Sequence, residues 1–214
     1  MNRPEERQQI DAGARALGVS LDELQLDRLQ QYLDLLERWN RSHNLSAVRE
    51  RSSMVVQHLL DCLGIVAPLR RERPAGGRLL DVGSGGGLPG VVVAIAAPEW
   101  RVCSIDAVAK KAAFVRQVAG ALRLGNVEVR HGRVEEVADP HDVIVSRAFG
   151  SLADFVRLSA RARAAQGVWL AMKGREPRAE MAALPADGEV FHVEPLRVPE
   201  LDGSRCAVWM RPRG

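Results

Sequence analysis

The first third of the chain carries apolar residues at the spacing of an amphipathic helix. Between residues 21 and 39 they recur every three or four positions, which places them on one face of a helix. Ser20, followed three residues later by Glu23, is typical of a capping box at the start of such a helix. The apolar stripe consists of Leu21, Leu24, Leu29, Tyr32, Leu33, Leu35, Leu36 and Trp39.

A second helix is predicted from Ser52 or Ser53, and it ends by Pro68. The polar stretch RRERPAGG then links this region to the remainder of the chain. We therefore expect residues 1–73 to form an N-terminal helical extension that packs on the domain after it.

From residue 78 the pattern changes to short apolar runs that alternate with helical segments. This alternation is typical of an α/β domain, in which helices cover both faces of a parallel sheet. Two further strand-like runs near the end of the chain are separated only by a short loop, so they should form an antiparallel hairpin. We assign residues 74–214 to one α/β domain with a mostly parallel sheet and this C-terminal hairpin. The predicted strands are 78–82, 101–106, 126–130, 142–146, 167–172, 188–198 and 204–212, and the predicted helices are 88–97, 109–122 and 151–162.

The composition is that of an ordinary soluble globular protein, with 46% hydrophobic and 27% charged residues among 214. No uninterrupted apolar stretch approaches the roughly 18 residues of a membrane span, and the charged N-terminus lacks the apolar core of a secretory signal. Three isolated cysteines without CxxC spacing fit a reducing compartment and argue against a zinc site. We expect a cytoplasmic protein that uses neither a membrane nor a metal.

The charges are segregated along the chain. Residues 101–133 hold seven lysines and arginines against two acids, a net charge of +5, and residues 147–178 have the same balance. Between them, residues 134–146 hold four acids and no lysine or arginine. Two basic blocks around an acidic one indicate a polyanionic partner, although solvated helix faces in an arginine-rich protein would give the same pattern.

A glycine-rich loop follows the first predicted strand of the sheet, in the sequence LLDVGSGGGLPGVVVAIA at residues 79–96. Such a loop lies at the carboxyl edge of a parallel sheet, where ligands bind. The segment from Gly85 to Gly90 fits G-x-G-x-x-G, a dinucleotide fingerprint. The overlapping frame Asp81-x-Gly83-x-Gly85-x-Gly87 resembles the first motif of class I S-adenosyl-L-methionine (SAM) methyltransferases. Asp106, at the end of the second strand, suits the ribose hydroxyls of either cofactor class.

Six short motifs occur along the chain in this order: WNRSHNLS at 39–46, HLLDCL at 58–63, DVGSGGGLPG at 81–90, GRVEE at 132–136, VSRAF at 145–149 and MKG at 172–174. With these motifs the chain resembles, over nearly its whole length, the bacterial 16S rRNA guanine-N7 methyltransferases, also called the glucose-inhibited division protein B family. The resemblance implies a class I SAM-dependent methyltransferase fold, SAM as methyl donor and S-adenosyl-L-homocysteine as product. It also implies methylation of N7 of guanine 527 in the 530 loop of 16S rRNA, on the 30S subunit or an assembly intermediate.

The resemblance also implies site residues. Arg147, after the fourth strand, should lie beside the methionine end of SAM or the target base, and Lys173, after the fifth, should contact RNA phosphate or the base. Both are candidate catalytic residues. Arg147 could instead only form an ion pair with an acid such as Glu135. The predicted cofactor-binding residues are Asp81, Gly83, Gly85, Leu88, Asp106, Val134, Glu135 and Arg147.

The chemistry agrees with this assignment, because guanine N7 carries a free lone pair and needs alignment with the methyl donor more than a general base. Two other classes stay open at this point: a nucleotide-cofactor oxidoreductase and an RNA-binding factor without catalysis. Methylation of another RNA position is a further alternative. The chain has a single tyrosine, Tyr32, and thus no Tyr-x-x-x-Lys pair for an oxidoreductase, and the intact glycine loop argues against a factor that has lost catalysis.

Overall fold

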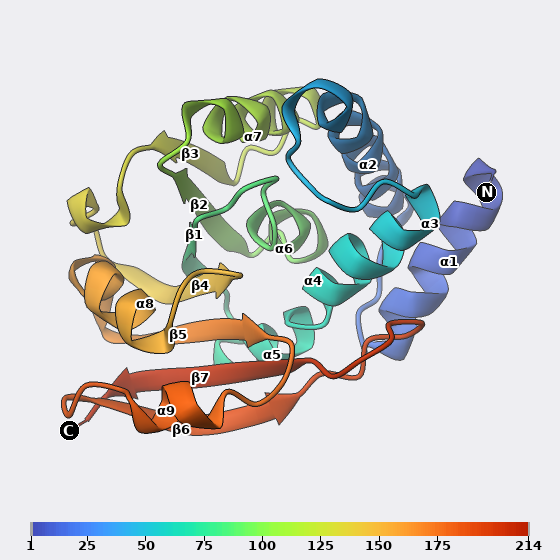
Figure 1. Cartoon of the computed structure of the whole chain (residues 1–214). Coiled ribbons are helices and arrows are strands. Elements are labelled where there is room, and N and C mark those ends of the chain that lie inside the picture. The colour runs from blue at the N-terminus through green and yellow to red at the C-terminus, as the bar shows by residue number, and fades with distance from the viewer. Residues whose placement is uncertain (1, 214) are drawn as a thin grey trace.

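A seven-stranded sheet forms the centre of the protein, described by a computed structural model over residues 2–213 (Figure 1). The strand order is β3-β2-β1-β4-β5-β7-β6, and only β7 runs antiparallel to its neighbours β5 and β6. The predicted parallel sheet and C-terminal hairpin are therefore confirmed. The strands are β1 (Gly77–Val82), β2 (Trp100–Asp106), β3 (Val127–His131), β4 (His141–Arg147), β5 (Arg163–Lys173), β6 (Gly188–Pro195) and β7 (Cys206–Pro212).

Successive side chains of each central strand point to opposite faces and enter two separate hydrophobic cores. In β1, Leu79 belongs to the larger core and Leu80 to the smaller. The larger core packs against α6 (Gly90–Ala96), α7 (Ala109–Ala121) and the N-terminal helices. The smaller packs against α8 (Leu152–Ser159), the 3-10 turns η2 (Val134–Glu136) and η3 (Ala160–Ala162), and the side of α9 (Arg178–Ala182).

The N-terminal helices are α1 (Arg3–Ala16), α2 (Glu23–His43), α3 (Arg51–Met54), η1 (Val55–Leu60), α4 (Asp61–Leu63) and α5 (Val66–Glu72). Helix α2 begins after Asp22, whose side chain accepts a hydrogen bond from the Gln25 amide while the Gln25 side chain accepts one from the Asp22 amide. The expected capping box at Ser20 was wrong by two residues, because Asp22 and Gln25 form the two reciprocal hydrogen bonds in place of Ser20 and Glu23.

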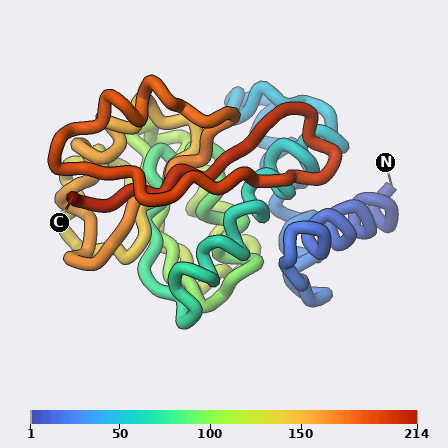
Figure 2. The backbone as a smooth tube through the Cα atoms, turned by 90° about the horizontal axis from the view of Figure 1, so that it is seen from below, coloured from blue at the N-terminus to red at the C-terminus, as the bar shows by residue number. Residues whose placement is uncertain are grey.

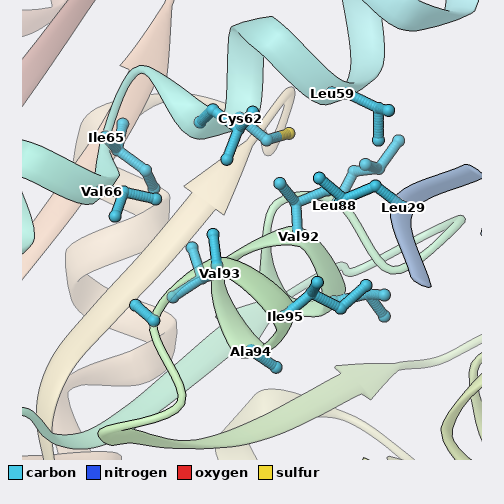
Figure 3. Close-up of a cluster of buried hydrophobic side chains, with 14 of the residues drawn as sticks. Leu29, Leu59, Cys62, Ile65, Val66, Leu88, Val92, Val93, Ala94 and Ile95 are labelled. Carbon is cyan, nitrogen blue, oxygen red and sulfur yellow. The ribbon is translucent and has the colours of Figure 1, made fainter. Parts of the chain in front are cut away.

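These helices share one continuous core with the sheet domain. Figure 3 shows Leu29 of α2 and Leu59 of η1 beside Leu88, Val92 and neighbouring residues of the glycine loop and α6. The boundary between residues 73 and 74 therefore separates two sequence patterns and does not separate two cores. That residues 1–73 are a distinct unit stays a prediction.

The helical stretch Arg51–Glu72 is long and apolar enough to cross a membrane, judged by length and composition alone. Of its most apolar 18-residue window, 78% is buried inside the fold. Its apolar residues therefore contact other parts of this protein, as in the core helix of a globular domain.

The long loop of the C-terminal hairpin, residues 196–205, reaches back to the N-terminal helices (Figures 1 and 2). There the side chain of Gln9 on α1 donates a hydrogen bond of 2.7 Å to Glu200. The loop of the C-terminal hairpin is thus joined to the first helix of the chain.

The N-terminal extension also contacts the glycine loop directly. The hydroxyl of Tyr32, on α2, is fully buried and donates a hydrogen bond of 2.7 Å to the carbonyl of Gly86. A buried carbonyl without a partner is costly, so this bond fixes the loop against α2.

We predict that Tyr32→Phe lowers the free energy of unfolding by about 1–3 kcal/mol, because it leaves the Gly86 carbonyl buried without a partner. Urea unfolding would measure the change. The control is Leu24→Ala on the same helix, where the side chain is 55% exposed and a change within about 0.5 kcal/mol is expected. Equal effects of the two substitutions would contradict this role of Tyr32.

Candidate functional site

The glycine loop turns the chain from β1 into α6 by backbone conformations that side chains disfavour. Gly83 has φ +68° and Gly87 has φ +83°, both in the left-handed region that glycine adopts without strain. A Cβ on Gly83 would lie 3.2 Å from the ring of Phe149, and one on Gly87 would lie 2.5 Å from Val91. Gly83, a predicted cofactor-binding residue, and Gly87 of the same motif frame therefore require glycine for geometric reasons.

A pocket of about 350 Å³ opens at the carboxyl ends of β1, β2 and β4, beside this loop. Four of the predicted cofactor-binding residues line it: Gly83, Asp106, Val134 and Glu135. Nine further lining residues were not predicted as site residues, although Val82, Gly132, Arg133, Ala148 and Phe149 lie within the motifs at 81–90, 132–136 and 145–149. These are Val82, Ile105, Ala107, Lys111, Gly132, Arg133, Ala148, Phe149 and Leu158.

Asp106 organises the floor of this pocket. One carboxylate oxygen accepts a hydrogen bond of 2.9 Å from the Gly85 amide, and the other accepts one of 2.8 Å from the Val108 amide. The ammonium of Lys111 lies 4.0 Å from the same carboxylate. Gly85 is thus brought to the site through its amide bond to Asp106, and it does not itself line the pocket.

Asp81, at the end of β1, and Leu88, within the loop, are buried and lie outside the lining of this pocket. The Asp81 carboxylate is fully buried and accepts a hydrogen bond of 2.9 Å from the Gly90 amide at the start of α6. Burial raises the pKa of Asp81 to about 7, although the Gly90 amide and the charge of Arg147 partly oppose it. Leu88 is 6% exposed and packs into the core beside Leu29 (Figure 3). Both residues hold the loop in place.

Arg147, at the end of β4, forms its ion pair with Asp61 and not with Glu135. Its Nη1 donates to the Asp61 carboxylate at 3.0 Å and to the carbonyl of Gln57 at 2.8 Å. The other Asp61 oxygen accepts a hydrogen bond of 3.0 Å from Nε of Arg205, in the hairpin loop. Glu135 instead pairs with Arg133 at 2.8 Å. The expected alternative partner for Arg147 was therefore wrong.

His58 lies next to this cluster on η1 and is 5% exposed. Its Nε2 is hydrogen bonded to the Ser46 hydroxyl at 2.7 Å. Burial and the charge of Arg147 lower the pKa of His58 to about 4, so the imidazole is neutral at physiological pH. A neutral imidazole does not compete with the Arg147 guanidinium for the Asp61 carboxylate.

Lys173, at the end of β5, is fully engaged by its neighbours. Its ammonium donates to both carboxylate oxygens of Glu180, at 2.9 and 3.2 Å, and to the carbonyl of Gly150 at 3.2 Å. An ammonium has three donors, and all three are used here. Lys173 thus lies at the same sheet edge as Arg147, where it links β5 to α9 and to the loop after β4.

Within residues 2–213 no group of three or more His, Cys, Asp or Glu side chains is arranged to hold a metal. The three cysteines of this range are free and buried. The site consists of the pocket at the glycine loop and, beside it, Arg147 and Arg205 bound to Asp61.

Comparison with solved structures defines the class of fold. The chain is similar to a structure of MtNAS in complex with MTA and tNA, with a TM-score of 0.58 and 15% identity over 96% of this chain and 75% of that one. It is also similar to TrmN from Thermus thermophilus, with a TM-score of 0.55 and 17% identity over 74% of this chain and 53% of that one. The fold is that of the class I SAM-dependent methyltransferases.

Sequence comparison then gives the family. The profile of the rRNA small subunit methyltransferase G family matches residues 25–208. Ribosomal RNA small subunit methyltransferase G of Methylibium petroleiphilum is 55% identical over 97% of this chain and 95% of that protein. That of Leptothrix cholodnii is 54% identical over 97% of this chain and 96% of that protein. The chain belongs to the rRNA small subunit methyltransferase G family.

We predict that Asp81→Asn changes how stability depends on pH. The pKa of Asp81 in the folded protein, about 7, lies above the ordinary value of 3.8. Between pH 4 and 7 the folded state therefore keeps a proton that the unfolded chain has lost, and the wild type loses stability as the pH rises.

The variant lacks this group but keeps an oxygen for the Gly90 amide. Its free energy of unfolding relative to wild type should rise by up to about 4 kcal/mol from pH 4 to pH 8, since one pKa unit corresponds to about 1.4 kcal/mol. Urea unfolding of both proteins across this range would measure the difference. A pH-independent difference would show that Asp81 titrates in the ordinary range.

Proposed function

We propose that this protein transfers the methyl group of SAM to N7 of guanine 527 in 16S rRNA. The observation that carries the proposal is the pocket beside the glycine loop, in a chain of the rRNA small subunit methyltransferase G family. The substrate is 16S rRNA, within the 30S subunit or an assembly intermediate, and the protein acts in the cytoplasm.

The pocket fits the nucleoside part of SAM. The Asp106 carboxylate lies in its lining, where hydroxyls of a ribose can donate to it, as an acid at the end of the second strand does in this class of sheet. Val134 and Glu135 supply an apolar contact and hydrogen-bonding atoms for the adenine. Gly83 is exposed and carries no side chain of its own, so a ligand can contact the loop backbone there directly.

Arg147 is the residue that we assign to alignment of the two reactants. A guanidinium has five donors, and Nη1 of Arg147 is occupied by Asp61 and Gln57. Its remaining N–H groups are available for the methionine carboxylate, the base or a phosphate. Lys173 supports the reaction by holding the loop after β4, and direct contact with RNA would require it to leave Glu180.

The reaction places few demands on acid–base groups. When bound, SAM supplies an electrophilic methyl group, and guanine N7 offers a lone pair at neutral pH. No proton has to leave N7 before the bond forms, so the work of the protein is to bind, orient and exclude competing nucleophiles. A neutral His58 and an arginine that cannot deprotonate agree with this demand.

The proposal is tested by methylating 30S subunits from cells that lack this activity with purified protein and SAM. Borohydride reduction followed by aniline cleaves RNA at 7-methylguanosine. We expect one new strand break, at guanine 527. Methyl incorporation without cleavage would overturn the N7 assignment, and cleavage elsewhere would overturn the position.

We predict that Gly83→Val reduces SAM affinity by at least about 100-fold, because the side chain meets Phe149 and the backbone needs a positive φ. Isothermal titration would measure affinity, and circular dichroism would confirm folding. The matched control is Gly125→Val, at a glycine whose added Cβ has no atom within 4 Å and whose φ is ordinary. Unchanged SAM affinity in Gly83→Val would remove the loop from the site.

Arg147→Ala should lower single-turnover methylation more than SAM affinity, because alignment matters most in the transition state. If Arg147 only bound the SAM carboxylate, affinity would fall by about 1.5–3 kcal/mol and turnover at saturating SAM would survive. Arg157→Ala serves as control, since Arg157 is exposed and, among residues 2–213, pairs only with Asp154 on its own helix. Wild-type values for Arg147→Ala in both assays would place the active site elsewhere.

A further inference from the structure

A second and larger hollow, of about 920 Å³, lies at the same edge of the sheet as the first pocket. One wall is the segment from Lys173 to Glu180, between β5 and α9, and the other is Ser204 and Arg205 of the hairpin loop. Nothing in the roles described above uses this hollow.

Two connections join the hollow to the first pocket. The Lys173 ammonium binds the carbonyl of Gly150 at 3.2 Å, and Phe149, the preceding residue, lines the first pocket. Arg205, in the wall of the hollow, shares the Asp61 carboxylate with Arg147. The loop after β4 thus lines the first pocket and contacts Lys173 in the wall of the hollow. Arg147 lines neither cavity, but it precedes the pocket residue Ala148 and shares Asp61 with Arg205.

The hollow carries positive charge that the protein does not neutralise. Across residues 2–213, Arg175 forms no side-chain hydrogen bond or ion pair. Within the described part of the chain Arg178 pairs only with Glu176, at 3.4 Å, and its side chain is 84% exposed. Exposed pairs of this kind contribute little, so both guanidinium groups are available to an anion.

The other basic region of the chain is arranged differently. Arg130 is held by Asp139 and Glu128, and Arg133 by Glu135. Arg101 is exposed and stands at the start of β2, so it lies at the amino edge of the sheet, opposite the glycine loop. The exposed cations Lys110 and Arg116 of this block lie on α7, and Arg123 follows that helix, so they stand on a different element from the hollow.

We propose that the hollow between residues 173–180 and 204–205 receives the RNA strand that carries the target guanine, with Arg175 and Arg178 bound to backbone phosphates. The strand then passes over the loop after β4 and presents its base beside Arg147. This inference rests on the proposed function and adds to it the surface that meets RNA. Phosphate contacts of this kind position a strand and do not read its sequence.

The test compares Arg175→Glu/Arg178→Glu with Arg101→Glu. All three are exposed arginines outside the first pocket. The double variant should raise KM for 30S subunits at least about tenfold and leave SAM affinity unchanged. Loss of two phosphate contacts should also lower the slope of log affinity against log salt by about 1.4–1.8. Arg101→Glu should behave as wild type.

Two outcomes would overturn the proposal: a wild-type KM and salt slope in the double variant, or an equal loss in Arg101→Glu, which would indicate a general charge effect. Measurements on the wild-type protein distinguish a failure of the proposed function from a failure of the RNA-binding proposal. If wild type binds SAM but does not methylate 30S subunits, the function fails, and binding of the 530-loop RNA still tests the hollow through the same salt slopes.

Discussion

The buried carboxylate of Asp61 joins three parts of the chain that are far apart in sequence. It lies in the helical region before the sheet, and it binds Arg147 at the end of β4 and Arg205 in the hairpin loop. Its side chain is only 4% exposed, and loss of one partner of such a buried pair typically costs about 3–5 kcal/mol. The position of Arg147, relative to both the first pocket and the hollow, therefore depends on the Asp61 carboxylate.

The helical segment just before Asp61 also helps to position Arg147. Residues Val55–Leu60 form a π-helix, which departs from regular α-helical hydrogen bonding and is common at functional sites. Within it the carbonyl of Gln57 accepts a hydrogen bond from Arg147. Together with the bond from Tyr32 to Gly86, this gives the N-terminal helices a direct part in the site. They hold the glycine loop on one side and the guanidinium on the other.

The sheet, the hairpin and the glycine loop could be predicted because each follows from local patterns: alternating runs, a short loop between two strands, and glycines where a turn needs positive φ. Asp106 could be predicted as a site residue for the same reason, because an acid at the end of the second strand is a local pattern. The partner of Arg147 could not be found this way, since Asp61 lies 86 positions away and any nearby acid satisfies the same rule. No sequence pattern pointed to Arg205. Lys173 was predicted to contact RNA as a free cation, whereas in the structure Glu180 neutralises its charge.

If the Asp61 carboxylate holds these three segments together, its replacement in Asp61→Asn should loosen all three, which amide hydrogen exchange under native conditions would detect. We expect exchange to accelerate together in residues 55–61, at the end of β4 around Arg147, and at Leu196, whose amide binds the Arg205 carbonyl at 2.8 Å. The ladder between β2 and β3 should stay protected as in wild type. Faster exchange in the helix alone, with unchanged protection at Arg147 and Leu196, would show that Asp61 does not join the segments.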